Sequence, residues 1–501
     1  MASVSLIATL TTPPSSSGAE LTALPSSVDW LEVRADLLGD INPELLRRHF
    51  QGRLLYSLRS RTEDNHSPDS RRERKRRLQT AARHYDRVEL EASGDLSPDL
   101  LATIPADKRL LSWYGLASDV VDLQAAFAQM SSVPAAAYKL ITSAARMADE
   151  FVPLFFLKTL GRTDTIAYCE GPLGFWSRLA ALHLGAPAIF GLVTNDPDNP
   201  ALPAIEKLIA NYGLPEVQPV TEIFAIIGNP IFHSLSPRLH NASYRATNHP
   251  ALFVPLQVES FEEFWREVVC SKVLDSLGMP IKGLTVASPH KEAALLSVNE
   301  ASPMSRRIES ANILVRSNGS WTADTTDPDI VYVAGQQPRI RLSRRQAAVI
   351  GCGGAGRAIA AALVQSGTEV TLINRGAARG HYASKLLGLP FRALSDFDAE
   401  GYDIVVNATP IGREAAEVPF NLDSLDKKAV VIDLVYGARP TPLIGSARSH
   451  QQVAIDGHDV LMTQVLKQFR MMTGKEMSSA LALETLRPAS GSKALEAKFV
   501  R

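Results

Sequence analysis

A glycine-rich segment at residues 348–356, AVIGCGGAG, lies between an apolar run and the helix-like sequence AIAAALVQSG. Gly351, Gly353 and Gly354 allow a tight turn and bring backbone N–H groups close to a pyrophosphate at the start of a helix. A strand, a glycine turn and a helix in this order are typical of dinucleotide binding. The segment therefore predicts a cofactor site.

The next predicted strand, EVTLIN at residues 369–374, indicates which dinucleotide binds. A carboxylate at the end of this strand would bond a free ribose 2′-hydroxyl and select NAD. Here the strand ends in Asn374 and Arg375, with Arg379 soon after, and arginines suit a 2′-phosphate. The sequence predicts NADP as the cofactor.

A second group of charged residues lies within apolar segments of the N-terminal half. Glu32, Arg34 and Asp36 alternate along LEVRAD, so we expect all three on one face of a strand. Unpaired charges are too costly to bury, which predicts a polar network at the mouth of a barrel. Arg59, at the end of a later strand, and Glu63 just beyond it are expected at the same rim.

Lys139 lies among apolar neighbours in AAAYKLIT, residues 135–142. Desolvation and nearby arginines lower the pKa of a lysine, and a neutral amine can attack a carbonyl to form a Schiff base. Arg178, in GFWSRLA, is predicted to hold a substrate carboxylate with two hydrogen bonds. A single lysine is more often an edge residue, but the charged strand ends around it favour catalysis.

The C-terminal half contains further candidates between residues 226 and 327. Ser234 and Ser236 suit a polyol carboxylate, although a serine before a proline also commonly caps a helix. Lys291 follows the predicted strand in GLTVASPHK, and Asp327 ends TADTTD. A lysine and an aspartate in one pocket can share a proton, as acid–base work at a carbonyl carbon requires.

These residues require strands and helices that alternate along the whole chain. Eight short apolar strands, each followed by a loop or helix, predict a parallel (β/α)8 barrel. We place its end near residues 216–222 and expect domains at 1–218, 222–338 and 340–460. A closing helix, about 461–485, is expected to complete the second domain. The eight predicted strands are residues 5–10, 31–36, 54–59, 87–92, 110–115, 138–142, 165–170 and 188–193.

Composition narrows the class of protein. The chain has 501 residues and a net charge of −1, with 52 basic and 53 acidic residues, so its charge predicts neither nucleic-acid nor membrane partners. The basic run RRERKRR at 71–77 is interpreted as the solvated face of an outer helix. Three separated cysteines without a CxxC motif favour the cytoplasm, and no metal site is predicted.

The N-terminal half, residues 3–215, resembles the type I 3-dehydroquinate dehydratases. The resemblance is carried by an ExRxD strand, an R-S-x-x-E segment, a lysine within a later strand and an S-R pair. It implies a (β/α)8 barrel in which Lys139 forms the Schiff base. By the same resemblance, the residues that bind or orient the substrate are Glu32, Arg34, Arg59 and Arg178, supported by Glu63.

The barrel departs from this family at two places. The fifth strand of the family ends in a histidine that acts as general acid and base, whereas this chain has Ser112-Trp113-Tyr114. Tyr114 and His66 are the candidates for its role. The closing-loop motif S-x-x-G-Q is replaced by DPDNPA at 196–201. A degenerate barrel that serves as a scaffold or binding module therefore remains an alternative.

The C-terminal half, residues 223–475, resembles the shikimate dehydrogenases through GNPIxHSxSPxxHN, PHK, TTD, GCGGAG and NATPIG. The resemblance implies a two-domain unit with a Rossmann domain for NADP, and Lys291 and Asp327 as the catalytic pair. Ala287 replaces a threonine that contacts substrate in the family, so quinate becomes an alternative substrate. Shikimate would be held by Ser234, Ser236, Asn312 and Gln464, and NADP by Gly351, Gly353, Gly354, Asn374, Arg375 and Arg379.

Asn407 and Thr409 belong to the NATP segment, which by the same resemblance lines the nicotinamide side, although such a segment can also be an ordinary strand-to-turn exit. The two resemblances together predict a bifunctional enzyme of the shikimate pathway. The barrel would convert 3-dehydroquinate to 3-dehydroshikimate, and the second half would reduce that product to shikimate with NADPH. The partners are therefore small molecules, and the sequence leaves the oligomeric state open.

Overall fold

The computed structural model describes residues 2–60, 70–144, 146–196, 198–199, 201–335, 340–413, 417–437 and 439–486. The chain forms two compact units, Met1–Ile223 with Pro230–Ile281, and Phe224–Asn229 with Lys282–Arg501. They are described in turn.

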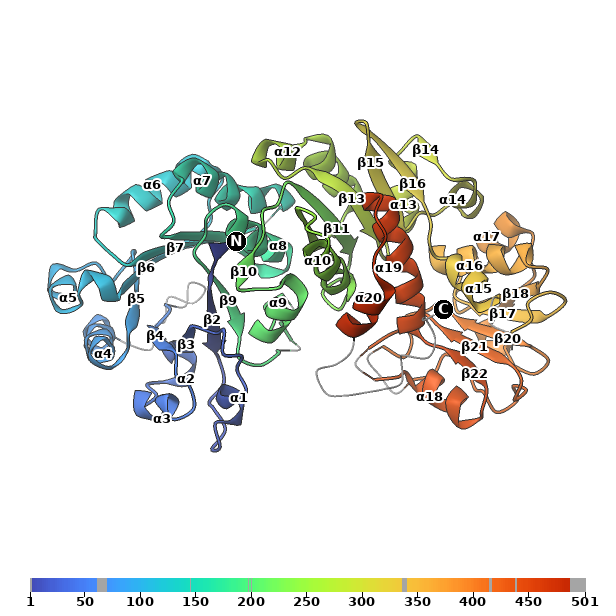
Figure 1. Ribbon diagram of the computed structural model, residues 1–501, viewed down its shortest axis with the longest axis horizontal. Coiled ribbons are helices and arrows are strands. Elements are labelled where there is room, and N and C mark those ends of the chain that lie inside the picture. The colour runs from blue at the N-terminus through green and yellow to red at the C-terminus, as the bar shows by residue number, and fades with distance from the viewer. Residues whose placement is uncertain are drawn as a thin grey trace. The chain divides into compact units, whose positions relative to one another are not determined.

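The first unit contains eight parallel strands in the spatial order β8-β7-β6-β5-β4-β3-β2-β9, which form a nearly closed barrel (Figure 1). The predicted N-terminal barrel is confirmed, with strand ends that differ by one or two residues from the sequence pattern. The strands are β2 (Ser5–Leu10), β3 (Trp30–Arg34), β4 (Arg53–Ser57), β5 (Arg87–Glu91), β6 (Arg109–Gly115), β7 (Ala137–Ser143), β8 (Thr165–Glu170) and β9 (Ala188–Leu192).

The predicted strand over residues 31–36 is too long. Strand β3 ends at Arg34, and Asp36 lies in the short helix α2 (Ala35–Leu38). The backbone of Arg34 already leaves the extended region, with φ −80° and ψ 79°. Glu32 and Arg34 therefore share a strand face, but the prediction that Asp36 alternates with them on one strand is wrong.

Helices follow the barrel strands in the chain. They include α4 (Arg71–His84), α5 (Pro98–Thr103), α6 (Val120–Ser131), α7 (Val152–Leu160), α8 (Gly171–His183) and α9 (Ile205–Tyr212). The short strands β1 (Ala2–Ser3) and β10 (Glu216–Val217) pair antiparallel. After the barrel, the unit continues through α10 (Ser236–Ala246), β12 (Ala251–Gln257), α11 (Phe261–Phe264), a π-helical turn (Trp265–Cys270) and α12 (Val273–Leu277).

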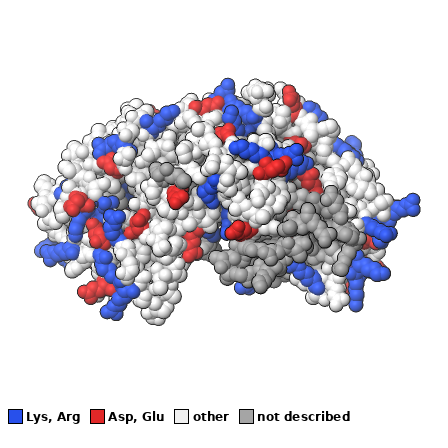
Figure 2. Space-filling view, in the orientation of Figure 1, with Lys and Arg blue, Asp and Glu red and all other residues white. Residues whose placement is uncertain are grey.

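The basic run at 71–77 forms the first half of α4, as expected for an outer helix. Its charges are largely paired: Arg74 bonds Asp95, Lys75 bonds Asp99, and Arg76 bonds Glu73. Figure 2 shows Lys and Arg side chains interspersed with Asp and Glu on the left of the view, where Figure 1 places α4 and α5. The run is therefore a mixed-charge helix surface.

The second unit contains two sheets. In the first, β11 (Glu222–Gly228), β13 (Ile281–Val286), β15 (Ile313–Ser317), β16 (Ser320–Asp324) and β14 (Glu300–Ala301) follow one another. The second sheet is parallel, with the order β19-β18-β17-β20-β21-β22. Its strands are β17 (Gln346–Ile350), β18 (Glu369–Asn374), β19 (Phe391–Ala393), β20 (Ile404–Asn407), β21 (Val430–Asp433) and β22 (Val453–Ile455).

The parallel sheet has the Rossmann arrangement, in which β17 lies between β18 and β20. Apolar side chains from β17, β18 and β20 pack with α16 (Gly354–Gln365), and residues such as Val349, Ile359 and Leu372 are completely buried. The predicted dinucleotide-binding fold is therefore confirmed. Other helices of this unit are α13 (Lys291–Leu296), α14 (Pro303–Ile308), α15 (Asp329–Gly335), α17 (Ala377–Leu387) and α18 (Pro442–Ser449).

The closing helix expected near residues 461–485 is two helices, α19 (Gly457–Thr473) and α20 (Ser479–Leu486). Helix α19 begins before Leu461 because the side chain of Asp456 accepts hydrogen bonds from the backbone N–H groups of His458 and Asp459. It ends where Gly474 adopts a left-handed conformation with φ 70°. Within the described residues, no helix combines the length and apolar character needed to span a membrane.

The contact between β8 and α8 gives a test of barrel packing. A Cβ at Gly174 would overlap the backbone oxygen of Cys169, so we expect Gly174→Ala to destabilise the barrel by about 1–3 kcal/mol. The matched control is Gly94→Ala, because a Cβ at Gly94 has no atom within 4 Å. Urea denaturation followed by tryptophan fluorescence measures both; equal midpoints for the two variants would contradict this packing.

Candidate active sites

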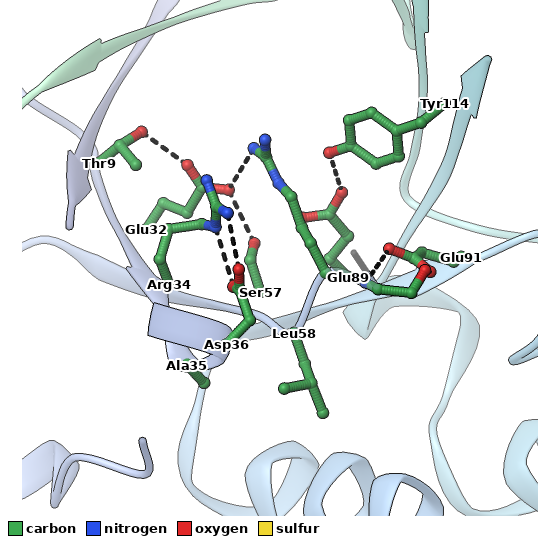
Figure 3. Close-up of polar contacts among 12 residues, drawn as sticks. Thr9, Glu32, Arg34, Ala35, Asp36, Ser57, Leu58, Glu89, Glu91 and Tyr114 are labelled. Carbon is green, nitrogen blue, oxygen red and sulfur yellow. Dashed lines mark hydrogen bonds and ion pairs between the residues drawn. The ribbon is translucent and has the colours of Figure 1, made fainter. Parts of the chain in front are cut away.

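Glu32 is a completely buried carboxylate on β3 inside the barrel. One oxygen accepts a hydrogen bond from Thr9 Oγ1 at 2.6 Å, and the other accepts one from Ser57 Oγ at 2.8 Å. Arg59 Nη2 lies 3.3 Å from the same oxygen as Ser57. Figure 3 shows Glu32 between Thr9 and Ser57, which come from neighbouring strands. The carboxylate is therefore held ionised and fixed in direction.

Arg34 and Asp36 form a separate ion pair beside Glu32. Two parallel hydrogen bonds join them, from Nε to Oδ1 at 2.9 Å and from Nη2 to Oδ2 at 2.7 Å. Both side chains are largely buried. Figure 3 shows the two bonds that join them. The structure thus brings the three charged residues of LEVRAD together, although by a strand end and a helix rather than by one strand.

Lys139 lies on β7 and forms an ion pair with Glu89 of β5, with Nζ 2.6 Å from Oε1. Both side chains are only 1% exposed. The hydroxyl of Tyr114, on β6, donates a hydrogen bond of 2.7 Å to the same Glu89 oxygen (Figure 3). The ammonium group also lies 4.8 Å from the ring centre of Phe190. The amine is therefore enclosed by one carboxylate and aromatic rings.

This enclosure sets the protonation of the three groups. Burial lowers the pKa of Lys139, and Arg59 acts in the same direction, although Glu89 opposes them. Burial alone would raise the pKa of Glu89, but the charges of Lys139 and Arg59 outweigh it and lower the pKa. Burial raises the pKa of Tyr114 well above its ordinary value, so its hydroxyl stays protonated.

Arg178 on α8 is buried and approaches the barrel interior from its last strands. Its Nη1 donates to the backbone oxygen of Phe190 at 3.0 Å, and the guanidinium lies 4.7 Å from the ring centre of Tyr168. Among the described residues, its Nε has no hydrogen-bond partner and remains a donor for a ligand. Glu63 and His66, both named from the sequence, lie outside the described residues.

Glu89 was not identified from the sequence. The signal was available, because RVELEA places two acidic residues in a buried strand, as LEVRAD does. Its neighbour Glu91 has a different environment, in which the backbone N–H and hydroxyl of Ser60 donate to it and Arg74 lies nearby. Glu91 therefore supports the loop after β4, while Glu89 contacts the lysine.

Ser234 and Ser236 lie at the start of α10 in the first unit, and both are buried. The Ser234 hydroxyl accepts a hydrogen bond from the backbone N–H of Ser236 at 3.2 Å, so it also supports the helix start. Ser234 lines a cavity of about 200 Å³ together with Asn195 and Lys207. Lys207 Nζ donates to Asn195 Oδ1 at 2.6 Å. This cavity offers a hydroxyl and an ammonium group to a small anion.

The second unit brings together Lys291, Asp327, Asn312 and Gln464. Lys291 Nζ lies 2.6 Å from Asp327 Oδ2. The other Asp327 oxygen accepts hydrogen bonds from Asn312 Nδ2 at 3.0 Å and Gln464 Nε2 at 2.9 Å. The lysine side chain is 18% exposed and the aspartate side chain 3%. The lysine therefore reaches solvent, while the two amides hold the buried aspartate in place. This geometry suits proton transfer to a bound ligand.

Two residues of this network were not identified from the sequence. Thr326 exchanges hydrogen bonds with Asn312, and Gln468 Nε2 donates to the Thr326 hydroxyl at 2.9 Å. Gln468 lies one helical turn after Gln464 on α19, so both amides face the same pocket wall. The pair of glutamines four residues apart was the available signal.

The glycine-rich turn between β17 and α16 has the space that a dinucleotide requires. Gly351 has φ +104°, and a Cβ there would lie 2.9 Å from the backbone oxygen of Ala408. A Cβ at Gly353 would meet no atom within 4 Å, so the backbone is open to a ligand at this point. A Cβ at Gly354 would lie 3.3 Å from Lys291 Cδ. The same Cβ would overlap the hydroxyl of Ser310, so Ser310 and Lys291 both lie near this turn.

The residues after β18 fit a 2′-phosphate. Asn374 fixes the turn, because its Oδ1 accepts from the backbone N–H of Cys352 at 3.1 Å. Arg375 is exposed, and Arg379 is 56% exposed with Nη2 3.0 Å from Glu292 Oε1. The completely buried Arg357 holds the same Glu292 oxygen at 2.8 Å. NADP would thus lie along Gly353 and the open start of α16, with its 2′-phosphate near the exposed arginines.

Asn407 and Thr409 form the turn after β20. Asn407 is completely buried; its Nδ2 donates to Asp433 at 2.9 Å, and its Oδ1 accepts from the Thr409 hydroxyl at 2.6 Å. These bonds occupy the polar atoms of Asn407 within the protein. The geometry therefore favours a structural role for Asn407, as the residue that ends β20 and begins the turn. The backbone of this turn lies beside Gly351.

Comparison with known families agrees with both halves. Residues 8–219 match the type I 3-dehydroquinase family, and residues 226–314 match the shikimate dehydrogenase substrate binding domain. Residues 346–437 match the family described as NADP oxidoreductase coenzyme F420-dependent. The order of the three matches follows the order of the barrel, the mixed sheet and the parallel sheet in the chain.

Known proteins resemble the chain over both halves or over one. A bifunctional 3-dehydroquinate dehydratase/shikimate dehydrogenase, chloroplastic, from Arabidopsis thaliana is 26% identical over 477 residues, which cover 89% of this chain and 78% of the relative. An NADP(+) shikimate dehydrogenase from Syntrophobacter fumaroxidans is 32% identical over 50% of this chain and 87% of its own length. A crystal structure of shikimate dehydrogenase from Aquifex aeolicus has 26% identity and a TM-score of 0.49, and covers 54% of this chain and 98% of that structure. The chain belongs to the shikimate dehydrogenase family, with a type I 3-dehydroquinase domain ahead of its dehydrogenase half.

Proposed function

We propose that the chain is a bifunctional enzyme that dehydrates 3-dehydroquinate in the barrel and reduces the product, 3-dehydroshikimate, to shikimate with NADPH. The observation that carries this proposal is the presence of two lysine–carboxylate pairs, one in each unit. Lys139 and Glu89 are buried, as imine chemistry requires, whereas Lys291 reaches solvent beside an oriented aspartate. The product of the first reaction is the substrate of the second.

In the barrel, Lys139 acts as the nucleophile toward the ketone. Its buried position favours the neutral amine, which attacks the carbonyl carbon and loses water to give a protonated imine. Arg34, Arg59 and Arg178 bind and orient the substrate, and Arg178 keeps a buried donor free for its carboxylate. Glu32 pairs with Arg59 at 3.3 Å and so fixes the position of this guanidinium.

In the dehydrogenase half, Lys291 donates a proton to the oxygen of the reacting carbonyl. Asp327 aligns the ammonium group, and its second oxygen is kept in place by Asn312 and Gln464. NADPH, when bound along the glycine turn, supplies the hydride. Lys291 lies near the cofactor turn, since a Cβ added at Gly354 would come within 3.3 Å of its Cδ.

Ala287 favours a second candidate substrate. The side chain that follows β13 is a methyl group, which provides no hydroxyl to bond the ring substituents. A shikimate/quinate dehydrogenase joined to a scaffold barrel is therefore the alternative function, and Tyr114 in place of the family histidine favours it. The two functions differ in whether Lys139 reacts with substrate.

The domain division at 1–218, 222–338 with 461–485, and 340–460 belongs to the same proposal. The three cysteines are free, which supports a reducing compartment such as the cytoplasm, although the name of the Arabidopsis thaliana relative includes the word chloroplastic. We expect small-molecule substrates only. Measuring each half-reaction on the purified chain tests the proposal as a whole.

Replacing Lys291 tests the dehydrogenase assignment. We expect Lys291→Ala to lower turnover of shikimate oxidation by about 10²–10⁴-fold, because it removes the proton donor. NADP binding, measured by fluorescence titration, should stay within a few fold. The control is Lys467→Ala on α19, which removes an ion pair with Asp329 of α15 but no proposed contact with the reacting carbonyl. Wild-type turnover in Lys291→Ala would contradict the role.

Cofactor choice follows from the arginines after β18. We expect Arg375→Ser to weaken NADPH binding more than Arg379→Ser, because Arg379 already pairs with Glu292 whereas Arg375 is exposed. NADH binding should change little in both variants, since NADH lacks the 2′-phosphate. Isothermal titration measures the four affinities. A wild-type protein that prefers NADH would overturn the assignment.

A covalent adduct tests the barrel. Incubation of the full chain with 3-dehydroquinate and borohydride should reduce the imine at Lys139 to a secondary amine. Peptide mass spectrometry should find the mass of the substrate minus one water plus two hydrogens on Lys139, and minus a second water where dehydration preceded reduction. Lys139→Arg should form no adduct, and the control Lys75→Arg, on the exposed face of α4, should behave as wild type. Without an adduct in the wild-type chain, the scaffold alternative would replace the dehydratase.

A further inference from the structure

Dehydration requires a base that removes a proton from the carbon next to the imine carbon, and the family histidine for this step is absent. We propose that Glu89 is this base and that the hydroxyl of Tyr114 relays the proton to the departing oxygen. The inference rests on the proposed dehydratase function of the barrel. It assigns an acid–base pair made by a carboxylate and a phenol.

The position of Glu89 carries the inference. Its Oε1 lies 2.6 Å from Lys139 Nζ, the atom that becomes the imine nitrogen. The carbon that loses its proton is only two bonds from that nitrogen, so a carboxylate at this distance reaches it. The second oxygen of Glu89 is buried and has no hydrogen-bond partner within the described part of the chain. A lone pair is therefore available in a site that excludes water.

Three other carboxylates near the barrel interior, among the residues that the structure describes, already have partners. Both oxygens of Glu32 accept hydrogen bonds, from Thr9 and Ser57, and Arg59 adds an ion pair. Asp36 is bound by Arg34 through both oxygens. Glu91 accepts from Ser60 and lies near Arg74. Of these four acids, Glu89 alone contacts the lysine.

Tyr114 is placed to donate rather than to accept a proton. Its hydroxyl already donates to Glu89 at 2.7 Å, and burial keeps the phenol protonated. Its ring centre lies 5.4 Å from Lys139 Nζ and 5.0 Å from the guanidinium carbon of Arg59. The phenol ring therefore lies close to both the reacting amine and a guanidinium proposed to bind substrate.

The steps balance with these two residues. Glu89 takes a proton from the carbon beside the protonated imine, and the C–H electron pair forms the enamine. The enamine expels the hydroxyl group from the next carbon, while Tyr114 gives that oxygen its proton and receives the proton from Glu89. Water leaves, Glu89 is again ionised, and the conjugated imine is hydrolysed to release the product and Lys139.

Two variants separate imine formation from dehydration. Glu89→Gln removes the base and also the anion that favours the protonated amine, so borohydride should still trap the Lys139 adduct. Dehydration, followed by the absorbance of the conjugated product, should fall by about 10²–10⁴-fold. Tyr114→Phe should also keep the adduct and lower kcat by about 10²-fold, with little change in KM.

The matched control is Glu150→Gln, which changes a buried carboxyl that bonds Trp176 and is outside this network. It should dehydrate the substrate at nearly the wild-type rate, and shikimate oxidation by each variant reports that the chain is folded. Wild-type dehydration by Glu89→Gln would overturn the inference and direct the search to His66. An adduct lost only in Glu89→Gln would also overturn it, because Glu89 would then serve imine formation. No adduct and no dehydration in the wild-type chain would refute the dehydratase itself.

Discussion

Burying an ammonium group inside an eight-stranded barrel is the constraint on which the N-terminal unit depends. A charged lysine without partners would be too costly there, so Lys139 requires a carboxylate, and that carboxylate requires further donors. Glu89 meets the first need, and Tyr114 supplies one of the donors. Glu32 and Arg59 form a second layer, with hydroxyl groups from adjacent strands. The polar interior thus consists of linked pairs rather than independent charges.

The dehydrogenase unit contains a similar lysine–carboxylate pair in a less buried position. Lys291 is partly exposed, so its charge is hydrated and the cost of burial falls on Asp327. Two amide side chains, from Asn312 and Gln464, bond the aspartate oxygen that faces away from the lysine. Because amides carry no net charge, the pair remains available for proton exchange with a ligand. The difference in burial distinguishes the proposed nucleophile, Lys139, from the proposed proton donor, Lys291.

Sequence reasoning found the residues whose charge stands out against an apolar background. Glu32 and Lys139 were visible in this way, and the glycine turn was visible because strand, glycines and helix occur in order. Glu89 gave the same signal but belonged to no recognised motif, so only its distance from Lys139 reveals it. The end of β3 at Arg34 was missed, since periodicity continues through Asp36 while the backbone turns.

The hydrogen-bond partners of individual side chains were the part of the structure that the sequence predicted least well. The sequence could place Asn407 beside the cofactor turn, but it could not show that the polar atoms of Asn407 are occupied by Asp433 and Thr409. Gln464 and Gln468 are the same type of residue, so the sequence does not distinguish them. Only the fold shows that Gln468 bonds Thr326, whereas Gln464 bonds Asp327. Which donor bonds which acceptor depends on their distances in the folded chain, and the sequence pattern does not give those distances.

The ion pairs of Glu292 have a consequence for how this enzyme can change. Lys291 and Glu292 are joined by one peptide bond, and Glu292 binds both Arg357 and Arg379. The helix start that carries the proposed proton donor therefore also pairs with an arginine proposed to face the 2′-phosphate. Because the completely buried Arg357 also holds Glu292, replacement of the exposed Arg379 leaves that anchor in place, and the residue that follows Lys291 keeps an ion pair.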